Sequence, residues 1–253
     1  MHGKKRISLN KIQHRRVHKI MICEHGFLIK KGMAVMAILK MFKKSALELK
    51  TLRCITVTGV LIALDLALKT VTINLEASLK ISFAFIALAA IGMLFGPTVS
   101  LLAGVITDVL GFFMYPQTGA FNPFFTLIEA VGGMLYGLFL YNLVYVRFDK
   151  DIFKAEGKSK IGKALLFLKK VGRIILAKVS VVIVCNLIMT PIANVIFGYQ
   201  TIETALLKYP ARLLKNLIQC PVDCALLIIV LFPILAAYKS VFKIGSVKPE
   251  AAK

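Results

Sequence analysis

The stretch 79–141 limits the possible folds most strongly, because three long apolar runs follow one another there, separated only by glycine, proline and a few polar residues. A helix needs about 20 predominantly apolar residues to cross a bilayer. Hydrophobic residues make up 58% of the 253-residue chain and charged residues 18%, whereas soluble domains carry about a quarter charged residues. The sequence therefore predicts an all-α integral membrane protein.

The apolar runs divide the chain into a membrane domain at 41–240, a cytoplasmic tail at 241–253 and a basic amino-terminal arm at 1–40. The arm has no apolar run long enough to span. It is either disordered, or a cytoplasmic segment lying on anionic lipid, or the result of a natural start at Met41. Six transmembrane helices are predicted, at about 52–71, 81–96, 98–114, 124–146, 173–197 and 209–238.

The charge of the chain indicates its orientation rather than a nucleic-acid partner. The 33 Lys and Arg residues outnumber the 12 Asp and Glu residues, for a net charge of +21. Basic residues concentrate in 1–50, in 147–170 and after Tyr238, which are alternate connections between the apolar runs. Cytoplasmic loops carry such an excess. Both termini are therefore predicted to be cytoplasmic, with the loops 72–80, 115–123 and 198–208 outside.

This topology brings polar side chains from several spans to the outer half of the membrane, beside an aromatic, uncharged loop. Ionisable residues within membrane spans are functional candidates. Aromatic faces suit a flat ring, amides and hydroxyls read its donors and acceptors, and cations bind carboxylates. Packing or interfacial anchoring explains any single member equally well. The candidate substrate-binding residues are Lys69, Lys80, Phe121, Asn122, Phe124, Thr126, Glu129, Asn186, Arg212 and Asn216.

Recognisable catalytic motifs are absent from the sequence. No phosphate-binding glycine-rich loop of the Walker type, HExxH or GxSxG motif occurs, and the four histidines all precede residue 26. Cys220 and Cys224 lie one helical turn apart, but no further ligand completes a metal site. We therefore predict a binding protein without cofactor or metal. A membrane enzyme using buried carboxylates is the alternative, although hydrogen bonding within the structure is the better interpretation of Asp108 and Asp223.

Two patterns in the first span predict contacts. Asp65 and Lys69 lie four residues apart and are expected to pair along the helix. Gly59, Ala63 and Ala67 form a stripe of small residues, which allows close approach of another helix in lipid. That helix belongs either to this chain or to a partner.

Several ordered segments resemble the substrate-binding S components of energy-coupling-factor vitamin importers, of the folate type. The resemblance covers about residues 41–240, although 122–126 reads Asn-Pro-Phe-Phe-Thr where Pro-Gly-Phe-Thr is usual, and Lys69 stands where Arg is expected. The segments that carry it are Leu79–Phe83, Gly92–Pro97, Asp108–Gly111, Tyr115–Leu127, Gly133–Phe139 and Tyr209–Asn216.

The resemblance implies the six-helix S-component fold in a bacterial cell membrane, with an outward pocket closed by the first and third external loops. It implies high-affinity binding of folate or a reduced folate. It also implies assembly with a transmembrane coupling subunit, contacted through Ala63 and Ala67, and with two ATP-binding-cassette ATPases that supply the energy. Riboflavin or pantothenate as the vitamin, and a structural anchor for an ATPase complex, are the alternatives.

Overall fold

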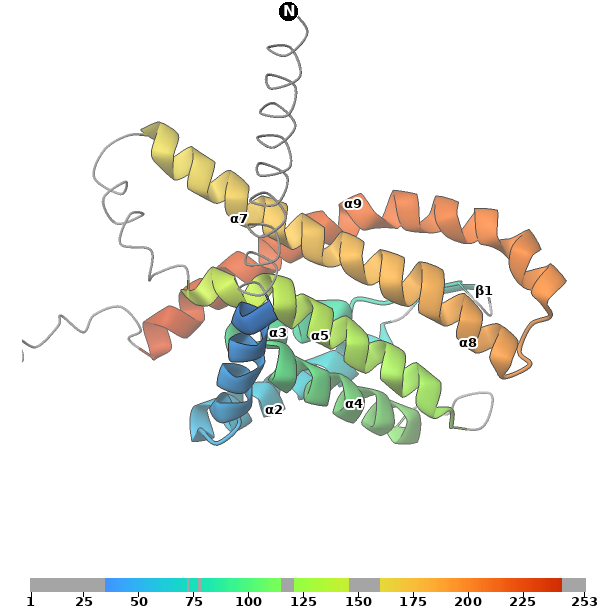
Figure 1. Cartoon of the computed structure of the whole chain (residues 1–253), viewed down its shortest axis with the longest axis horizontal. Helices are drawn as coiled ribbons and strands as arrows, with labels where there is room; N and C mark the ends of the chain where they lie inside the picture. Colours follow the sequence, from blue (N-terminus) through green and yellow to red (C-terminus); the bar gives the residue numbers. More distant parts are fainter. Residues whose placement is uncertain (1–34, 72, 77–78, 115–120, 146–159, 243–253) are drawn as a thin grey trace, which may run out of the picture. The chain divides into compact units, whose positions relative to one another are not determined.

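The computed structural model describes residues 35–71, 73–76, 79–114, 121–145 and 160–242 (Figure 1). The chain divides into two compact units, 1–43 and 44–253. A helix spans Val35–Glu48, and the predicted arm 1–40 and tail 241–253 otherwise lie almost wholly outside the described residues. The remaining elements are α2 (Leu52–Thr70), β1 (Ile73–Glu76), β2 (Leu79–Ile81), α3 (Phe85–Phe95), α4 (Pro97–Met114), α5 (Pro123–Tyr145), α7 (Lys160–Val181), the π-helix η2 (Val182–Met189), α8 (Thr190–Ile196) and α9 (Ile202–Val241).

The predicted all-α membrane fold is confirmed in its helical character, although β1 and β2 add two short strands. Four described helices are long and apolar enough to cross a membrane, or up to five if Val35–Glu48 and α2 together form one bent span. At 11 residues, α3 is apolar but short. The four are Pro97–Met114, Pro123–Tyr141, Phe167–Ile196 and Ile202–Tyr238.

Helix α3 is the buried centre of the larger unit. Every residue from Ile86 to Phe95 is buried, and α2, α4, α5 and α9 all contact this helix (Figure 1). A helix that is hydrophobic all round has no polar face to turn to solvent and belongs inside. Because other helices surround α3, it does not need the length of a lipid-exposed span.

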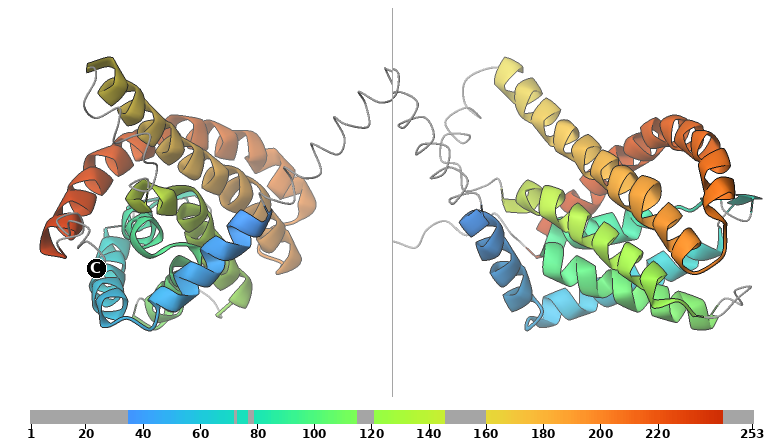
Figure 2. Two further views of the ribbon diagram at one scale, coloured as in Figure 1. Left: turned by 60° about the vertical axis from the view of Figure 1, so that its left-hand side comes forward. Right: turned by 45° about the vertical axis from the view of Figure 1, so that its right-hand side comes forward.

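Glycines allow α5 to lie directly against α3 and α4, and both views of Figure 2 show these helices side by side. A Cβ placed on Gly92 of α3 would lie 2.7 Å from the backbone nitrogen of Gly137 in α5. A Cβ on Gly104 of α4 would lie 2.7 Å from the carbonyl oxygen of Glu129. Small residues permit such backbone contact between helices in lipid. The close crossing of α5 over α3 and α4 therefore depends on these glycines.

Ser45 and Gly96 shape the junction between α3 and α4. Gly96 has φ +91°, a conformation that glycine adopts without steric cost, and Pro97 begins α4 where no N–H is needed. The Ser45 hydroxyl is fully buried and donates to the carbonyl of Phe95 at 2.7 Å. It also accepts from the backbone N–H of Thr98 at 3.0 Å. Ser45 therefore satisfies backbone groups of both helices.

Three connections differ from the predicted polar loops. Helix α7 begins at Lys160, inside the basic connection predicted to precede the fifth span at 173. The strands β1 and β2 pair as an antiparallel hairpin in which Ile73 lies opposite Ile81, because alternating apolar and polar residues suit strands. Helix α9 begins at Ile202, not at about 209, since the Thr201 side chain accepts the N–H of Thr204 and caps the helix. The acidic Glu203 in its first turn suits the helix dipole.

Helices α7 and α9 are joined by an ion pair within the apolar interior. Lys178 Nζ lies 2.8 Å from Asp223 Oδ2, and both side chains are almost fully buried. The same ammonium lies 3.6 Å from the ring centroid of Phe85 in α3, where the aromatic face attracts a cation. The expectation that Asp223 serves the structure is therefore confirmed.

Replacing Gly137 by alanine should destabilise the protein by about 1–3 kcal/mol, because the new methyl group would clash with the backbone at Pro97. Thermal unfolding in detergent measures the effect. Gly172→Ala in α7 is the matched control, since a Cβ there meets nothing within 4 Å and alanine favours a helix by about 1 kcal/mol. Equal melting temperatures for the two variants would contradict the assigned role of the α5 crossing.

Candidate functional site

Two polar groups lie near α5. One is formed by α2, α4 and α5, and the other by α9 and η2, which contacts α5 where Cys185 donates to the carbonyl of Ile128. The first, the carboxylate cluster, consists of Asp65, Lys69, Asp108, Thr126 and Glu129. The second, the amide cluster, consists of Asn186, Arg212 and Asn216. Both groups come from spans whose polar residues are predicted from the sequence to converge, and each group is assembled from different helices.

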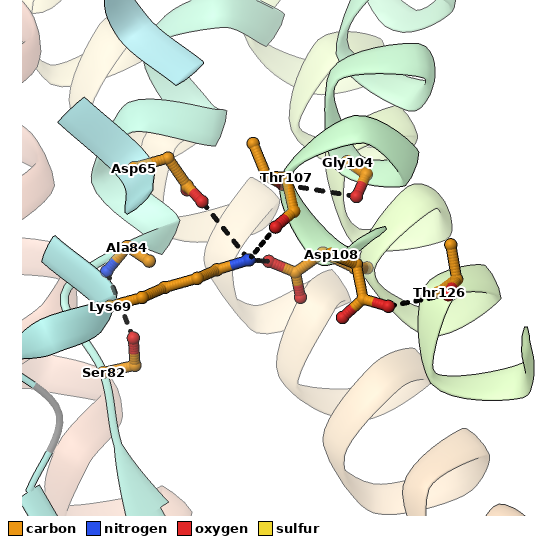
Figure 3. A network of polar contacts seen from close by, with 9 residues as sticks. Asp65, Lys69, Ser82, Ala84, Gly104, Thr107, Asp108 and Thr126 are labelled. Carbon is orange, nitrogen blue, oxygen red and sulfur yellow. Dashed lines mark hydrogen bonds and ion pairs between the residues drawn. The ribbon is translucent and has the colours of Figure 1, made fainter. Parts of the chain in front are cut away.

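In the carboxylate cluster, Lys69 of α2 extends across α4 toward α5 (Figure 3). Its Nζ lies 3.3 Å from Asp65 Oδ2 and 3.7 Å from Glu129 Oε1, and donates to the carbonyl of Thr107 at 3.1 Å. The side chain passes Gly111, where an added Cβ would lie in ordinary contact with it, 3.5 Å from Lys69 Cδ. The predicted pairing of Asp65 with Lys69 is confirmed.

The carboxylate cluster carries more negative than positive charge. Asp65, Asp108 and Glu129 contribute three carboxylates against the one ammonium of Lys69. The hydroxyl of Thr126 donates to Asp108 Oδ2 at 2.6 Å, which confirms a hydrogen-bonding role for Asp108 (Figure 3). Ionised carboxylates only accept hydrogen bonds. The cluster therefore favours a ligand edge that carries N–H donors.

The amide cluster forms a closed ring of hydrogen bonds between η2 and α9. Asn186 Nδ2 donates to Asn216 Oδ1 at 3.2 Å, and Asn216 Nδ2 donates to the carbonyl of Arg212 at 2.9 Å. The Arg212 guanidinium then donates to the carbonyl of Asn186 at 3.4 Å. This ring fixes the first half of α9 against the π-helix.

Arg212 is a buried cation without a nearby counter-charge. Its relative exposure is 8%, and no carboxylate of the described residues lies within 4.0 Å of its guanidinium. A buried charge without a partner is costly in an apolar environment. Arginine offers five N–H donors in a planar fork that fits a carboxylate. The arrangement leaves donors free for an anionic ligand.

Aromatic side chains surround the entry to α5. The ring of Phe124 lies 5.9 Å from that of Phe197, and Phe125 lies 6.1 Å from Tyr199. Phe121 is partly exposed and lies 5.1 Å from Phe112. These distances are typical of aromatic pairs. The rings connect the end of α4, the start of α5 and the end of α8.

Several predicted residues have structural partners or lie beyond the described side chains. Asn122 accepts the N–H of Phe124 at 2.9 Å and so caps α5. Only the backbone of Lys80 is described, paired with Asn74 in the hairpin. Tyr115 lies outside the described residues. Among the residues that are described, no group of three His, Cys, Asp or Glu side chains could hold a metal ion.

Sequence reasoning missed Phe197, Tyr199 and the π-helix. The two aromatic residues lie just after the fifth predicted span, on the same predicted side as the aromatic loop, so their position was a usable signal. The π-helix leaves only a weak signal, namely Pro191 inside an apolar run, because hydropathy does not distinguish α from π hydrogen bonding.

Comparisons with known proteins agree on one family. A protein-family model, described as ECF transporter, substrate-specific component, matches residues 53–239 of this chain. A protein of Clostridium novyi (strain NT), named folate transporter FolT, is 45% identical over 64 residues, which cover 25% of this chain and 37% of that protein. The chain thus matches little more than a third of the length of this relative.

A solved structure gives a longer alignment. The crystal structure of FolT bound with folic acid is 27% identical, with a TM-score of 0.52, and the alignment covers 76% of this chain and 95% of that one. The helical arrangement described above is therefore similar to that of FolT.

Replacing Lys69 by methionine should destabilise the protein by about 3–5 kcal/mol, because it leaves the fully buried Asp65 without its cation. The double variant Asp65→Asn/Lys69→Met removes both charges and should recover much of this loss. Thermal unfolding without ligand measures both proteins. A double variant no more stable than Lys69→Met alone would show that the charges of Asp65 and Lys69 do not compensate each other.

Proposed function

This chain belongs to the family of substrate-specific components of ECF transporters, and on that premise we propose that it is the folate-binding component of such a transporter. Two similar proteins support folate as the ligand: the folate transporter FolT of Clostridium novyi (strain NT) and the FolT whose structure contains folic acid. Membership in a family of transporter components also favours binding over catalysis.

The observation that carries the proposal is the buried, uncompensated guanidinium of Arg212. Folate carries a glutamate tail with two carboxylates, and an arginine fork can hold one of them through two hydrogen bonds. Asn186 and Asn216 are fixed beside Arg212 and can contribute amide contacts. We assign the amide cluster to the acidic end of the ligand.

The carboxylate cluster suits the other end of folate. The pteridine ring carries an amino group and, beside it, a ring N–H, and both donate hydrogen bonds. Glu129, partly exposed with a relative side-chain exposure of 34%, can accept from them. Lys69, Lys80 and Thr126 are assigned to the same end, and Phe121 and Phe124 supply ring faces. Asn122 holds the start of α5, which presents these residues.

The proposed transport role places folate capture, of the oxidised or a reduced form, on the outer side of a bacterial cell membrane. The chain would cross that membrane six times with both termini in the cytoplasm, as the alternation of basic loops indicates. Delivery inward would depend on a transmembrane coupling subunit and two ATP-binding-cassette ATPases that hydrolyse ATP. Toppling of the whole component in the membrane would carry the site inward.

The surface proposed for the coupling subunit is the small-residue stripe of α2. Ala63 and Ala67 are exposed, and a Cβ on Gly59 would meet nothing within 4 Å. The opposite side of the helix supplies the buried residues Cys54, Leu61 and Asp65. The stripe is therefore available to another helix, which small residues allow to approach closely.

Arg212→Ala should weaken folate binding by about 30-fold or more, since removing one member of a buried charge pair costs about 2–5 kcal/mol. Calorimetric titration of the purified protein measures this affinity. Arg173→Ala in α7 is the matched control and should bind like the wild type. Undiminished folate binding by Arg212→Ala would refute the assignment of the amide cluster.

Mass spectrometry of the ligand that co-purifies with the wild-type protein tests the vitamin itself. Folate or a reduced folate is expected. Riboflavin or pantothenate in its place would assign the chain to a sister vitamin, and riboflavin, which has no carboxylate, should be insensitive to Arg212→Ala.

Ala63→Trp should abolish folate uptake while leaving folate binding unchanged, because the large ring blocks the approach of the coupling subunit. Uptake in cells that express the complete transporter, together with binding by the purified variant, measures the two effects. Ile229→Trp, at an exposed position on α9, is the control and should preserve both. Loss of folding in Ala63→Trp would instead assign the stripe to packing within this chain.

A further inference from the structure

The helix that begins as α7 changes its hydrogen-bonding pattern at η2 and returns to α-helix at α8. In a π-helix each N–H donates to the carbonyl five residues earlier. The N–H of Thr190 accordingly donates to the carbonyl of Cys185. The Thr190 hydroxyl donates to the same carbonyl at 2.7 Å. Thr190 is thus held on Cys185 by two bonds.

This pattern leaves the carbonyl of Asn186 without its usual backbone donor. In an α-helix the donor would be the N–H of Thr190, which is bound to Cys185 instead. In a π-helix the donor would be residue 191, which is proline and has no N–H. The group that approaches this carbonyl is the guanidinium of Arg212, at 3.4 Å. A side chain thus takes the place of a backbone donor.

We propose that Pro191 is a positioning residue for Arg212. By withholding an N–H, Pro191 keeps the Asn186 carbonyl open, and that carbonyl holds the guanidinium through one N–H. The remaining N–H groups of the Arg212 guanidinium then point toward a carboxylate of the ligand. This inference rests on the proposed function, because it takes folate as that ligand, and it makes Pro191 a determinant of selectivity for an anionic tail.

The closed set of hydrogen bonds in the amide cluster explains why the orientation of the Arg212 side chain depends on Pro191, which lies on another helix. Asn216 donates to the Arg212 carbonyl and accepts from the Asn186 side chain. Arg212 is therefore linked to Asn186 in two ways. Its carbonyl is linked through the side chain of Asn216, and its guanidinium donates directly to the Asn186 carbonyl. A backbone N–H at position 191 would compete with the guanidinium for the carbonyl of Asn186 and for no other group of the cluster. Such a donor would therefore displace only the guanidinium.

The test compares folate with its diamide, in which neutral amides replace both tail carboxylates. Wild-type protein should prefer folate. Pro191→Ala restores an N–H at position 191 and should lower folate affinity by about tenfold, the effect of misplacing one charge-assisted hydrogen bond. Its affinity for the diamide should stay within about twofold of wild type. Pro233→Ala, at an exposed proline within α9, is the matched control and should keep the preference.

A double-mutant cycle separates positioning from a general loss of structure. If Pro191 acts through Arg212, adding Pro191→Ala to Arg212→Ala should not reduce folate affinity further. Additive losses, or equal losses for folate and the diamide, would overturn the proposal. Should Pro191→Ala not yield folded protein, Thr190→Val is measured in the same way, because it removes the hydroxyl bond to Cys185 and lets the backbone N–H of residue 190 return to the carbonyl of Asn186. An unchanged preference in that variant would also overturn it.

The same measurements distinguish the two levels of inference. Wild-type protein that binds neither folate nor the diamide would contradict the proposed function. Wild-type protein that prefers folate, together with a Pro191→Ala variant that keeps this preference in full, would contradict only the role of Pro191.

Discussion

The contact of α5 with the backbones of α3 and α4 is the constraint on which the candidate site depends. Gly92, Gly104 and Gly137 bring the helix axes closer than side chains would allow. Because the crossing is so close, Glu129 in α5 comes within 3.7 Å of Lys69, which extends from α2 across α4. The same crossing places Thr126 against Asp108. A wider spacing would separate these groups even with every side chain unchanged.

Charge compensation in the apolar interior distinguishes structural from binding groups. Lys178 is matched by Asp223, and Lys69 by Asp65 and Glu129. Arg212 has no carboxylate of the described residues at ion-pair distance. Because an unmatched buried charge costs free energy that the fold must offset, this difference is the reason we propose that a ligand supplies the missing charge at Arg212. The proposed assignment of the two clusters follows from it.

The sequence predicts the helical membrane fold and the local Asp65–Lys69 pair well, because hydropathy and four-residue spacing are local properties. It predicts less about which polar side chains meet. Asn122 is predicted to contact the ligand, and its capping of α5 was not predicted, since capping depends on where a helix begins. The π-helix around Asn186 lay beyond prediction, because an apolar run fixes the length of a helix but not its hydrogen-bond register.

The buried ion pair of Lys178 and Asp223 also bears on how the chain enters the membrane. Each residue alone would cost about 2.5–3.5 kcal/mol at the centre of an inserting helix. Paired at 2.8 Å, they offset each other, so α7 and α9 insert at lower cost together than in succession. We therefore expect α7 to remain beside the insertion machinery until α9 has been synthesised.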